Sequence, residues 1–411
     1  MRYSAFNLFK NAFKNHENWP RAWRSPAPKK MYDVIIIGGG GHGLGAAYYL
    51  AKIHGIKNVA VLEKGWLGGG NTARNTMTIR DNFIYPDNAV FHHEAVKLWH
   101  GLSDELNFNI MVSKRKMLSI LMSDRDLSDA KRMINTSTLF GGEHNLITKE
   151  ELHRRLPMAA SSSRMPTVAG IDHPEVVIAR HDAVAWGYAR AADALGVDII
   201  QNCEVTGILK DEKGICGVKT KLGEIQTRKL GLAVAGHGKQ VGEMAGIELP
   251  IETVPLQAFV STPVKPIFDE VVVLRGLNTY FMQSDKGELV MGAGTDPYPS
   301  YAQKGTSSVP EGVVASILEL FPTFQRMKFM RQWAGVLDLI YDNSPIISKT
   351  EINGLYVDAA GSGGFKTTPL AAKMHADLIA NDKADPLIEP YSLERFSSGK
   401  LILERASYGN R

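Results

Sequence analysis

The residues with the most specific chemistry lie in a glycine run, Gly38-Gly39-Gly40-Gly41-His42-Gly43. It contains G-x-G-x-x-G at Gly38, Gly40 and Gly43, a spacing that permits a tight turn, close approach of the backbone to a pyrophosphate, and close packing of a helix on a strand. Free N–H groups at the start of that helix would face the phosphates. Glu63 lies 20 residues after Gly43, where a carboxylate can accept hydrogen bonds from ribose hydroxyls. The run and this acid together predict a dinucleotide site.

A polar segment follows Glu63 and extends from Lys64 to Arg80. It opens with a glycine turn and continues with amide, hydroxyl and guanidinium donors. A polar surface loop would have the same composition, but the position directly after the ribose acid favours a second cofactor-contacting segment. The residues assigned to this contact are Lys64, Gly70, Asn71, Thr72, Arg74 and Asn75.

The elements around the glycine run fit this interpretation. Residues 32–37 form an apolar run suited to a parallel strand covered on both faces. Small apolar residues at 44–50 have helical spacing, and 59–62 predict a second strand. A glycine run alone could be a flexible turn, whereas the complete order of strand, turn, helix, strand and acid indicates dinucleotide binding.

Two domains are expected from 411 residues, 44% of them hydrophobic. Alternating aromatic-containing segments at 255–294 predict an antiparallel sheet in a second domain. The strand at 331–340 is expected to lead back to the first domain, where a late strand at 355–360 enters a second glycine loop and a helix.

Spacing alone does not separate NAD from FAD, but this interrupted order favours a flavin fold. The predicted class is α/β, an FAD-binding Rossmann-like domain with an inserted antiparallel-sheet substrate domain. The boundaries are a basic N-terminal tail at 1–30, a discontinuous FAD-binding domain at 31–90, 155–250 and 330–385, a substrate or interface domain at 91–154 and 251–329, and a C-terminal tail at 386–411.

Local signals place several further residues. Thr148 begins a capping box, and Asp182 is expected to cap a helix at 183–195. Cys203 and Cys216 are both expected in strands, and two cysteines provide no disulfide framework, so a reducing, cytoplasmic setting is the default. No metal-ligand spacing is recognised, and the adjacent His92-His93 pair is expected at the surface.

The net charge of +4 is too small to indicate a nucleic-acid partner, and no apolar run is long enough to span a bilayer. The basic excess is local, because residues 1–30 carry +6 together with six large apolar side chains. The continuous apolar stretch of a signal peptide is missing there. Such a tail could lie on a membrane, but docking on a partner subunit or on the chain's own body is favoured.

Several long segments resemble one family of flavoenzymes. They are 23–26, 38–44, 61–71, Arg180-His181-Asp182 with the five residues after it, 283–290, and Gly363-Gly364-Phe365-Lys366. Together they resemble the beta subunits of heterotetrameric sarcosine oxidases, within the amino-acid oxidase superfamily. The matches span nearly the whole chain.

This resemblance implies two flavins. FAD would be held non-covalently, with Glu63 on its ribose, Val205 near the adenine, and Gly363 to Lys366 beside the isoalloxazine. FMN would be joined covalently to His181 at an interface with the alpha subunit. A neutral imidazole can add to the 8α-methyl carbon of an oxidised flavin. From the sequence alone, a single histidine before a helix would be read as a cap or a core hydrogen-bonding group.

The resemblance also assigns the catalytic residues. Arg80 and Lys366 would fix the carboxylate of a small secondary amino acid, the first as a bidentate fork and the second as a point charge. A phosphate or surface contact is the alternative for Arg80, and a solvated lysine for Lys366. Electrons would pass from FAD to FMN to oxygen, giving hydrogen peroxide, with formaldehyde or 5,10-methylenetetrahydrofolate as the other product. The implied partners are alpha, gamma and delta type subunits.

The chain departs from the family pattern near the presumed substrate face. Asp81 and Phe83 stand where serine and tyrosine are expected, and an inward carboxylate would weaken a site for an anion. Residues 338–345 differ from the family's run, and the loop at 360–363 lacks an expected tryptophan. No cysteine lies near Tyr341, which argues against a covalent FAD.

Three other functions stay open. A related flavin dehydrogenase could act on dimethylglycine or a hydroxyproline. The chain could also be a flavin-bearing scaffold subunit without its own substrate site, or, with the least support, a nicotinamide dehydrogenase.

Overall fold

The computed structural model describes residues 4–19, 21–160 and 164–404, without the side chains of Ala293 and Ser362. The outermost parts of the two predicted tails, 1–3 and 405–411, lie outside the described residues, as does position 20. Within the described part of the chain, no helix combines the length and apolar character needed to cross a lipid bilayer.

A six-stranded sheet carries the predicted strand–turn–helix unit. Its order is β17 (Ile346–Lys349), β18 (Leu355–Ala359), β11 (Leu230–Leu232), β1 (Val34–Ile37), β2 (Val59–Leu62) and β7 (Asp198–Ile200). All neighbours are parallel except β17 and β18. The glycine run leaves β1 and enters α2 (Gly41–Lys52), so the predicted unit is confirmed.

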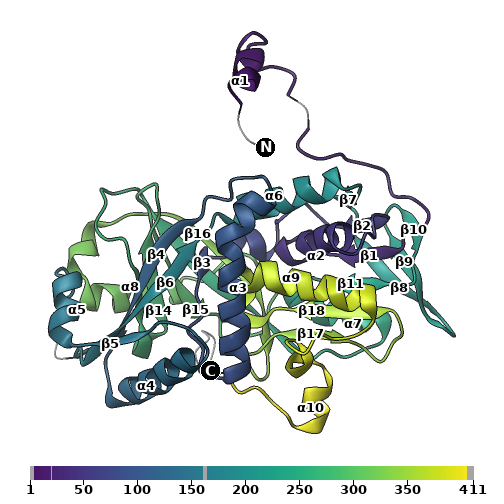
Figure 1. Cartoon of the computed structure of the whole chain (residues 1–411). Helices are drawn as coiled ribbons and strands as arrows, with labels where there is room; N and C mark the ends of the chain where they lie inside the picture. Colours follow the sequence, from purple (N-terminus) through teal and green to yellow (C-terminus); the bar gives the residue numbers. More distant parts are fainter. Residues whose placement is uncertain (1–3, 20, 161–163, 405–411) are drawn as a thin grey trace.

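Both faces of this sheet are covered, which explains why its central strands are apolar throughout. On one face, Val34 and Ile36 of β1 pack in a core with α2, α3 (Pro86–Glu105), α6 (His181–Ala194) and α9 (Gly364–Asn381). On the other, Ile35 and Ile37 pack against α7 (Gly238–Ala245) and a small antiparallel sheet. That sheet consists of β8 (Val205–Asp211), β9 (Gly214–Thr220) and β10 (Gly223–Gln226). Figure 1 shows α2, α9 and the crossing helix α3 together on one side.

A larger nine-stranded sheet forms the other half of the molecule. Its main path is β16 (Phe329–Ile340), β12 (Ile251–Ser261), β15 (Leu289–Thr295), β14 (Thr279–Gln283), β13 (Val271–Leu274), β4 (Ser113–Leu121), β6 (Ala169–Ile178) and β3 (Thr78–Ile79), with β5 (Asn145–Ile147) beside β6. It is antiparallel as predicted, except for the parallel pair β13 and β4. Helices α4 (Asp124–Leu139), α5 (Lys149–Arg155) and α8 (Ser308–Leu320) belong to this half (Figure 1).

The strand at 331–340, expected to lead back to the first domain, lies in the nine-stranded sheet, and the next strand, β17, lies in the six-stranded sheet. As β16, the strand at 331–340 pairs with β12 along the whole length of that strand, because both are long and mainly apolar. β3 and β6 also lie in the nine-stranded sheet. The domain boundaries themselves stay a prediction.

Three local expectations are also corrected. His92 is buried at 2% exposure, because α3 turns that face toward the core. Cys203 lies in the loop before β8 rather than in a strand. The N-cap of α6 is Arg180, and Asp182 lies in the first turn. The cap at Thr148 is confirmed, since its Oγ1 accepts from Glu151 N at 3.2 Å.

The N-terminal tail forms a short helix, α1 (Ala5–Ala12), that stands away from the body of the molecule (Figure 1). Phe6 and Phe9 on this helix are 78% and 65% exposed. The tail joins the body further along, where Arg24 Nε donates to Asp193 at 2.8 Å and Lys29 Nζ lies 2.7 Å from the buried Asp198. Trp23 also packs against the hydrophobic core. The anchor therefore combines ion pairs with apolar packing, and the aromatic helix beyond it is left uncovered.

Candidate active site

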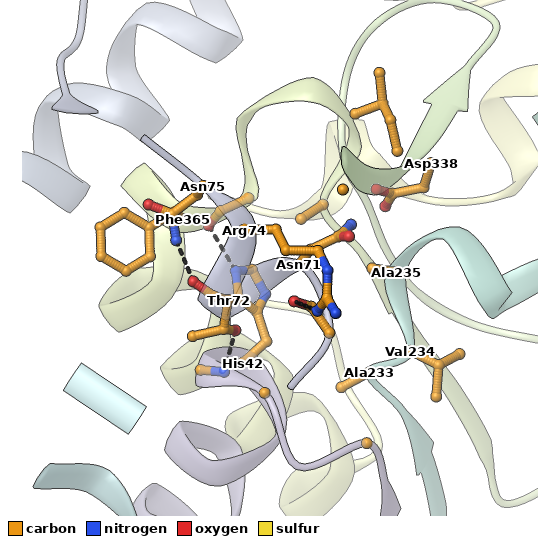
Figure 2. A pocket seen from close by; sticks show the side chains of 18 of the residues that line it. His42, Asn71, Thr72, Arg74, Asn75, Ala233, Val234, Ala235, Asp338 and Phe365 are labelled. Atoms are coloured by element: carbon orange, nitrogen blue, oxygen red, sulfur yellow. Dashed lines mark hydrogen bonds between the residues drawn. The ribbon is translucent and has the colours of Figure 1, made fainter. Parts of the chain in front are cut away.

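A cavity of about 510 Å³ lies where the two large sheets meet, a size in the usual range for ligand sites. The carboxyl ends of β1, β2 and β11 open into it, which is where ligands bind in open α/β sheets. Strands β12, β13 and β14 of the second sheet supply the opposite wall. Figure 2 shows His42, Asn71, Thr72 and Arg74 gathered around this space.

The glycine turn has the geometry that a pyrophosphate needs. Gly38 has φ +110°, and a Cβ there would lie 2.3 Å from Ala233 O. A Cβ at Gly43 would lie 1.9 Å from Gly38 O, so only glycine lets α2 approach β1 this closely. The N-cap of α2 is Gly40, which has no side chain to occupy the helix terminus. The positive end of α2 is therefore accessible to phosphate oxygens.

Glu63 is held in place by the backbone. Its Oε2 accepts from Gly39 N and its Oε1 accepts from Gly65 N, both at 2.8 Å. Each oxygen keeps a further lone pair for a ribose hydroxyl. These residues fit the adenosine half of a dinucleotide.

The polar segment after Glu63 folds into a 3-10 helix, η1 (Asn71–Arg74), which links the two halves of the molecule. Thr72 Oγ1 accepts from Gly41 N at 3.0 Å and so braces the glycine turn. Asn71 bonds Val336 of β16 twice, donating to its carbonyl at 2.7 Å and accepting from its N–H at 2.8 Å. Arg74 donates to the carbonyl of Gly70 at 2.8 Å. The segment lines the cavity, but several of its polar side chains already make hydrogen bonds within the protein, and these bonds hold the segment in place.

A buried charge cluster lies beneath the turn. His42 Nδ1 lies 2.8 Å from Asp358 Oδ2, and His42 Nε2 lies 2.8 Å from Gly364 O. Both partners are acceptors, so the ring donates from both nitrogens and carries a charge. Burial opposes that charge, but Asp358 and the Gly364 carbonyl together outweigh burial and raise the pKa of His42 to about 8. Burial raises the pKa of the neighbouring Asp338 to about 7, despite a hydrogen bond from Gly361 N.

Two cations meet over one aromatic ring at the cavity wall. Arg80 Cζ and Lys366 Nζ lie 5.2 Å and 5.9 Å from the centroid of Phe83. Burial lowers the pKa of Lys366 well below its ordinary value, and the charge of Arg80 acts in the same direction. Behind Phe83 stacks His92, with ring centroids 3.6 Å apart. Burial also lowers the pKa of His92, which keeps this ring neutral beside the two cations.

Asp81 does not contribute a carboxylate to this wall. His93 Nδ1 donates to its Oδ2 at 2.8 Å, and His173 Nε2 lies 2.8 Å from its Oδ1. The side chain is 3% exposed and is not among the residues lining the cavity. The concern that this acid repels an anionic ligand is therefore removed.

The structure gathers nearly all of the predicted site residues around the one cavity. Those that line it are Gly38, Gly40, Gly41, His42, Glu63, Lys64, Gly70, Asn71, Thr72, Arg74, Asn75, Arg80, Val205, Gly363, Gly364, Phe365 and Lys366. Gly43 lies just below, as a packing position. Only His181 is separate, at the start of α6.

Sequence reasoning missed two acids, Asp338 and Asp358, which line the cavity and lie in the buried, mainly apolar parts of β16 and β18. A carboxylate in such a strand is a signal, because burying an unpaired charge is costly. The loop at Ala233–His237, which directly follows β11, was also missed.

Fold and site together define a dinucleotide-binding protein whose ligand lies between a parallel nucleotide sheet and a second, mainly antiparallel sheet. The family model described as FAD dependent oxidoreductase matches residues 33–378. The chain belongs to this family of FAD-dependent oxidoreductases, and within it to the family of sarcosine oxidase beta subunits, by the relatives described next.

Sarcosine oxidase subunit beta of Rhodobacter capsulatus is 44% identical over 410 residues, covering 99% of each chain. The subunit of the same name from an Arthrobacter species is 47% identical over 388 residues, or 94% of this chain and 96% of that one. Among solved structures, L-proline dehydrogenase from P. horikoshii superimposes with a TM-score of 0.84 at 29% identity, covering 91% of this chain and all of the other.

Proposed function

We propose that this chain oxidises a small secondary amino acid, with sarcosine as the first candidate, and that it does so as the beta subunit of a hetero-oligomer. The products would be glycine, hydrogen peroxide, and either formaldehyde or 5,10-methylenetetrahydrofolate. The relatives of the same length and name support this substrate.

The observation that carries the proposal is that one cavity holds both the nucleotide-binding turn and the Arg80–Lys366 pair. Bound FAD would supply the electron acceptor for oxidation of the carbon–nitrogen bond. Arg80 would clamp the substrate carboxylate as a bidentate fork, and Lys366 would add a second charge. Holding the substrate carboxylate at Arg80 and Lys366 would turn a bimolecular encounter into an oriented one, which is worth several kcal/mol of the barrier.

The test is a panel of amines offered to the purified protein, with peroxide measured. Sarcosine should give the highest kcat/KM, and N-acetylglycine, which lacks a basic amine, should give none. Equal rates with glycine and sarcosine would contradict a preference for secondary amines.

A second substrate is favoured by one comparison. The structure at 29% identity is named as acting on L-proline, itself a secondary amino acid. The same two cations would bind its carboxylate. A higher kcat/KM for L-proline, dimethylglycine or a hydroxyproline than for sarcosine would assign the chain to this alternative.

His181 is the proposed attachment site of a covalent FMN. Its Nδ1 is buried and has no hydrogen-bond partner among the described residues. Burial lowers the pKa of the ring, and this effect exceeds the opposing one of Asp182, so the imidazole is neutral and nucleophilic. The residue does not line the FAD cavity, which leaves it available to a second flavin.

Acid precipitation of the denatured protein tests the attachment. Flavin fluorescence should remain with the polypeptide and map to the peptide that contains His181, while the FAD is released to the supernatant. His181→Ala should lose the flavin fluorescence that stays with the polypeptide and should keep the FAD that is released to the supernatant. Fluorescence entirely in the supernatant of the wild-type protein would reject the covalent link.

Alpha, gamma and delta type subunits are the proposed partners. The exposed aromatic helix α1 supports this part of the proposal, because Phe6, Leu8 and Phe9 are all exposed on one short helix and clustered exposed apolar side chains mark protein interaction sites. Its anchor at Asp193 and Asp198 fixes where the helix leaves the body.

A further inference from the structure

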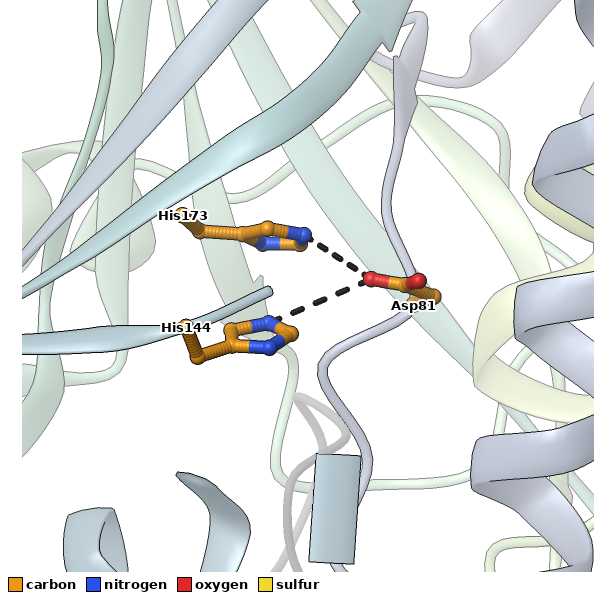
Figure 3. A group of neighbouring side chains, drawn as sticks. All are labelled: Asp81, His144 and His173. Atoms are coloured by element: carbon orange, nitrogen blue, oxygen red, sulfur yellow. Dashed lines mark ion pairs between the residues drawn. The ribbon is translucent and has the colours of Figure 1, made fainter. Parts of the chain in front are cut away.

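A cluster of buried side chains lies outside the cavity and has no role in the proposed reaction. It consists of Asp81, His144 and His173, which are 3%, 4% and 1% exposed. One ligand atom from each lies within 4.8 Å of the others. Figure 3 shows both imidazole rings directed at the carboxylate.

Hydrogen bonding within the protein does not satisfy this cluster. Among the described residues, Asp81 Oδ1 and all four ring nitrogens of His144 and His173 have no hydrogen-bond partner. His173 Nε2 lies 2.8 Å from Asp81 Oδ1 but is not aligned for a hydrogen bond. The two rings are 3.9 Å apart between centroids. Buried polar atoms left unpaired cost about 1–3 kcal/mol each, so a missing ligand would account for the arrangement.

The spacing of the donor atoms suits a metal ion. Asp81 Oδ1 lies 2.8 Å from His173 Nε2 and 3.9 Å from His144 Nε2. These values bracket the separation of roughly 3.4 Å between ligands that lie about 2.0–2.1 Å from a tetrahedral zinc ion. Two imidazoles and a carboxylate form a ligand set used for Zn²⁺ and other divalent transition metals.

The hydrogen bond to the second carboxylate oxygen of Asp81 also fits a metal site. Asp81 Oδ2 accepts from His93 Nδ1 at 2.8 Å, which leaves Oδ1 to face the two histidines. A ligating carboxylate is commonly oriented by such a hydrogen bond on its second oxygen.

We propose that Asp81, His144 and His173 form a binding site for a divalent transition metal, with Zn²⁺ as its first candidate. The ligands come from three separate segments, namely the turn after β3, the loop before β5 and the strand β6. A bound ion would tie these segments together and hold the residue next to Asp81, which is Arg80. The metal site would therefore be structural, and it would position Arg80 through the adjacent Asp81. The inference does not depend on the identity of the substrate.

The test is metal binding by the full-length chain, prepared without a histidine tag and stripped with a chelator. Titration calorimetry with Zn²⁺ should show one tight site per chain, and Co²⁺ should give the intense visible bands of a four-coordinate site. His144→Ala and His173→Ala should each weaken binding by at least ~100-fold. His100→Ala, which removes an exposed histidine of α3, should leave it unchanged.

Wild-type protein that binds Zn²⁺ no better than His144→Ala would overturn the proposal, as would tight binding that survives both ligand substitutions. X-ray absorption at the zinc edge gives a measurement that needs no variant. It should show scattering from two imidazoles, and a spectrum without imidazole scattering would also reject the site.

Discussion

At the scale of single residues, the site is organised before any ligand enters it. Glu63 receives two backbone hydrogen bonds, and Asn71 is held by both polar groups of Val336. Groups that are fixed in this way lose little entropy on binding, which favours affinity. The same rule applies to Arg80, whose guanidinium bonds the carbonyl and side chain of Asn82.

Arg80→Gln should lower kcat/KM for sarcosine by roughly 10- to 150-fold, because a charged hydrogen bond contributes about 1.5–3 kcal/mol. The loss should appear mainly in KM, since the cation acts on the substrate carboxylate. Flavin content, read from visible absorbance, should not change. Arg132→Gln, at an exposed position of α4, is the matched control. An unchanged KM would remove Arg80 from the substrate site.

His42 should make stability depend on pH. Its pKa rises from 6.5 to about 8 on folding, so its contribution is complete below pH 6.5 and is lost as pH rises through about 8. The shift corresponds to about 2 kcal/mol. The difference in the free energy of unfolding between wild type and His42→Gln should therefore shrink by about this amount from pH 6 to pH 9. A difference between wild type and His42→Gln that stays constant from pH 6 to pH 9 would contradict the assigned ion pair with Asp358.

At the scale of elements, the close contact between α2 and β1 sets the cofactor site. Gly43→Ala would place a methyl group 1.9 Å from Gly38 O, so α2 must shift. FAD binding should fall below detection by absorbance, with a lower Tm. Gly101→Ala is the matched control, because nothing lies within 4 Å of the new methyl group at that helical glycine. This variant should be more stable than wild type by about 0.5–1 kcal/mol in the free energy of unfolding. Normal flavin content in Gly43→Ala would show that the contact is not needed.

Local motifs were readable from the sequence, and long-range pairings were not. The glycine turn and Glu63 were predicted because a strand, turn, helix and acid follow one another within about thirty residues, the length of one βαβ unit. The sheet membership of β16 was missed, since its partner β12 lies far away in the chain. The Asp81 cluster was missed for the same reason. Its three members meet only through the pairing of β3 and β5 with β6.

At the scale of the whole molecule, the two halves define the site and the tail extends from it. The cavity is lined by residues of both halves, which Asn71 of η1 joins at β16, so cofactor binding should depend on both halves folding together. The N-terminal tail does not contribute to the cavity, since its aromatic helix α1 touches neither half (Figure 1).

Replacing Phe6 and Phe9 together by serine should weaken assembly with partner subunits, because two exposed rings would no longer be buried there. Co-expressed complexes measured by size exclusion should yield less assembled protein, with flavin content per chain unchanged. Asn7→Ser, on the same helix, should assemble normally. Full assembly of the double variant would place the partner contact elsewhere.

The most direct measurement for the central claim is anaerobic mixing of the purified flavoprotein with sarcosine while the visible absorbance is followed. The absorbance of the oxidised flavin should be lost on mixing and should return when oxygen is admitted, with peroxide formed. A flavin-loaded protein whose absorbance is unaffected by sarcosine and by every other secondary amino acid tried would contradict this claim.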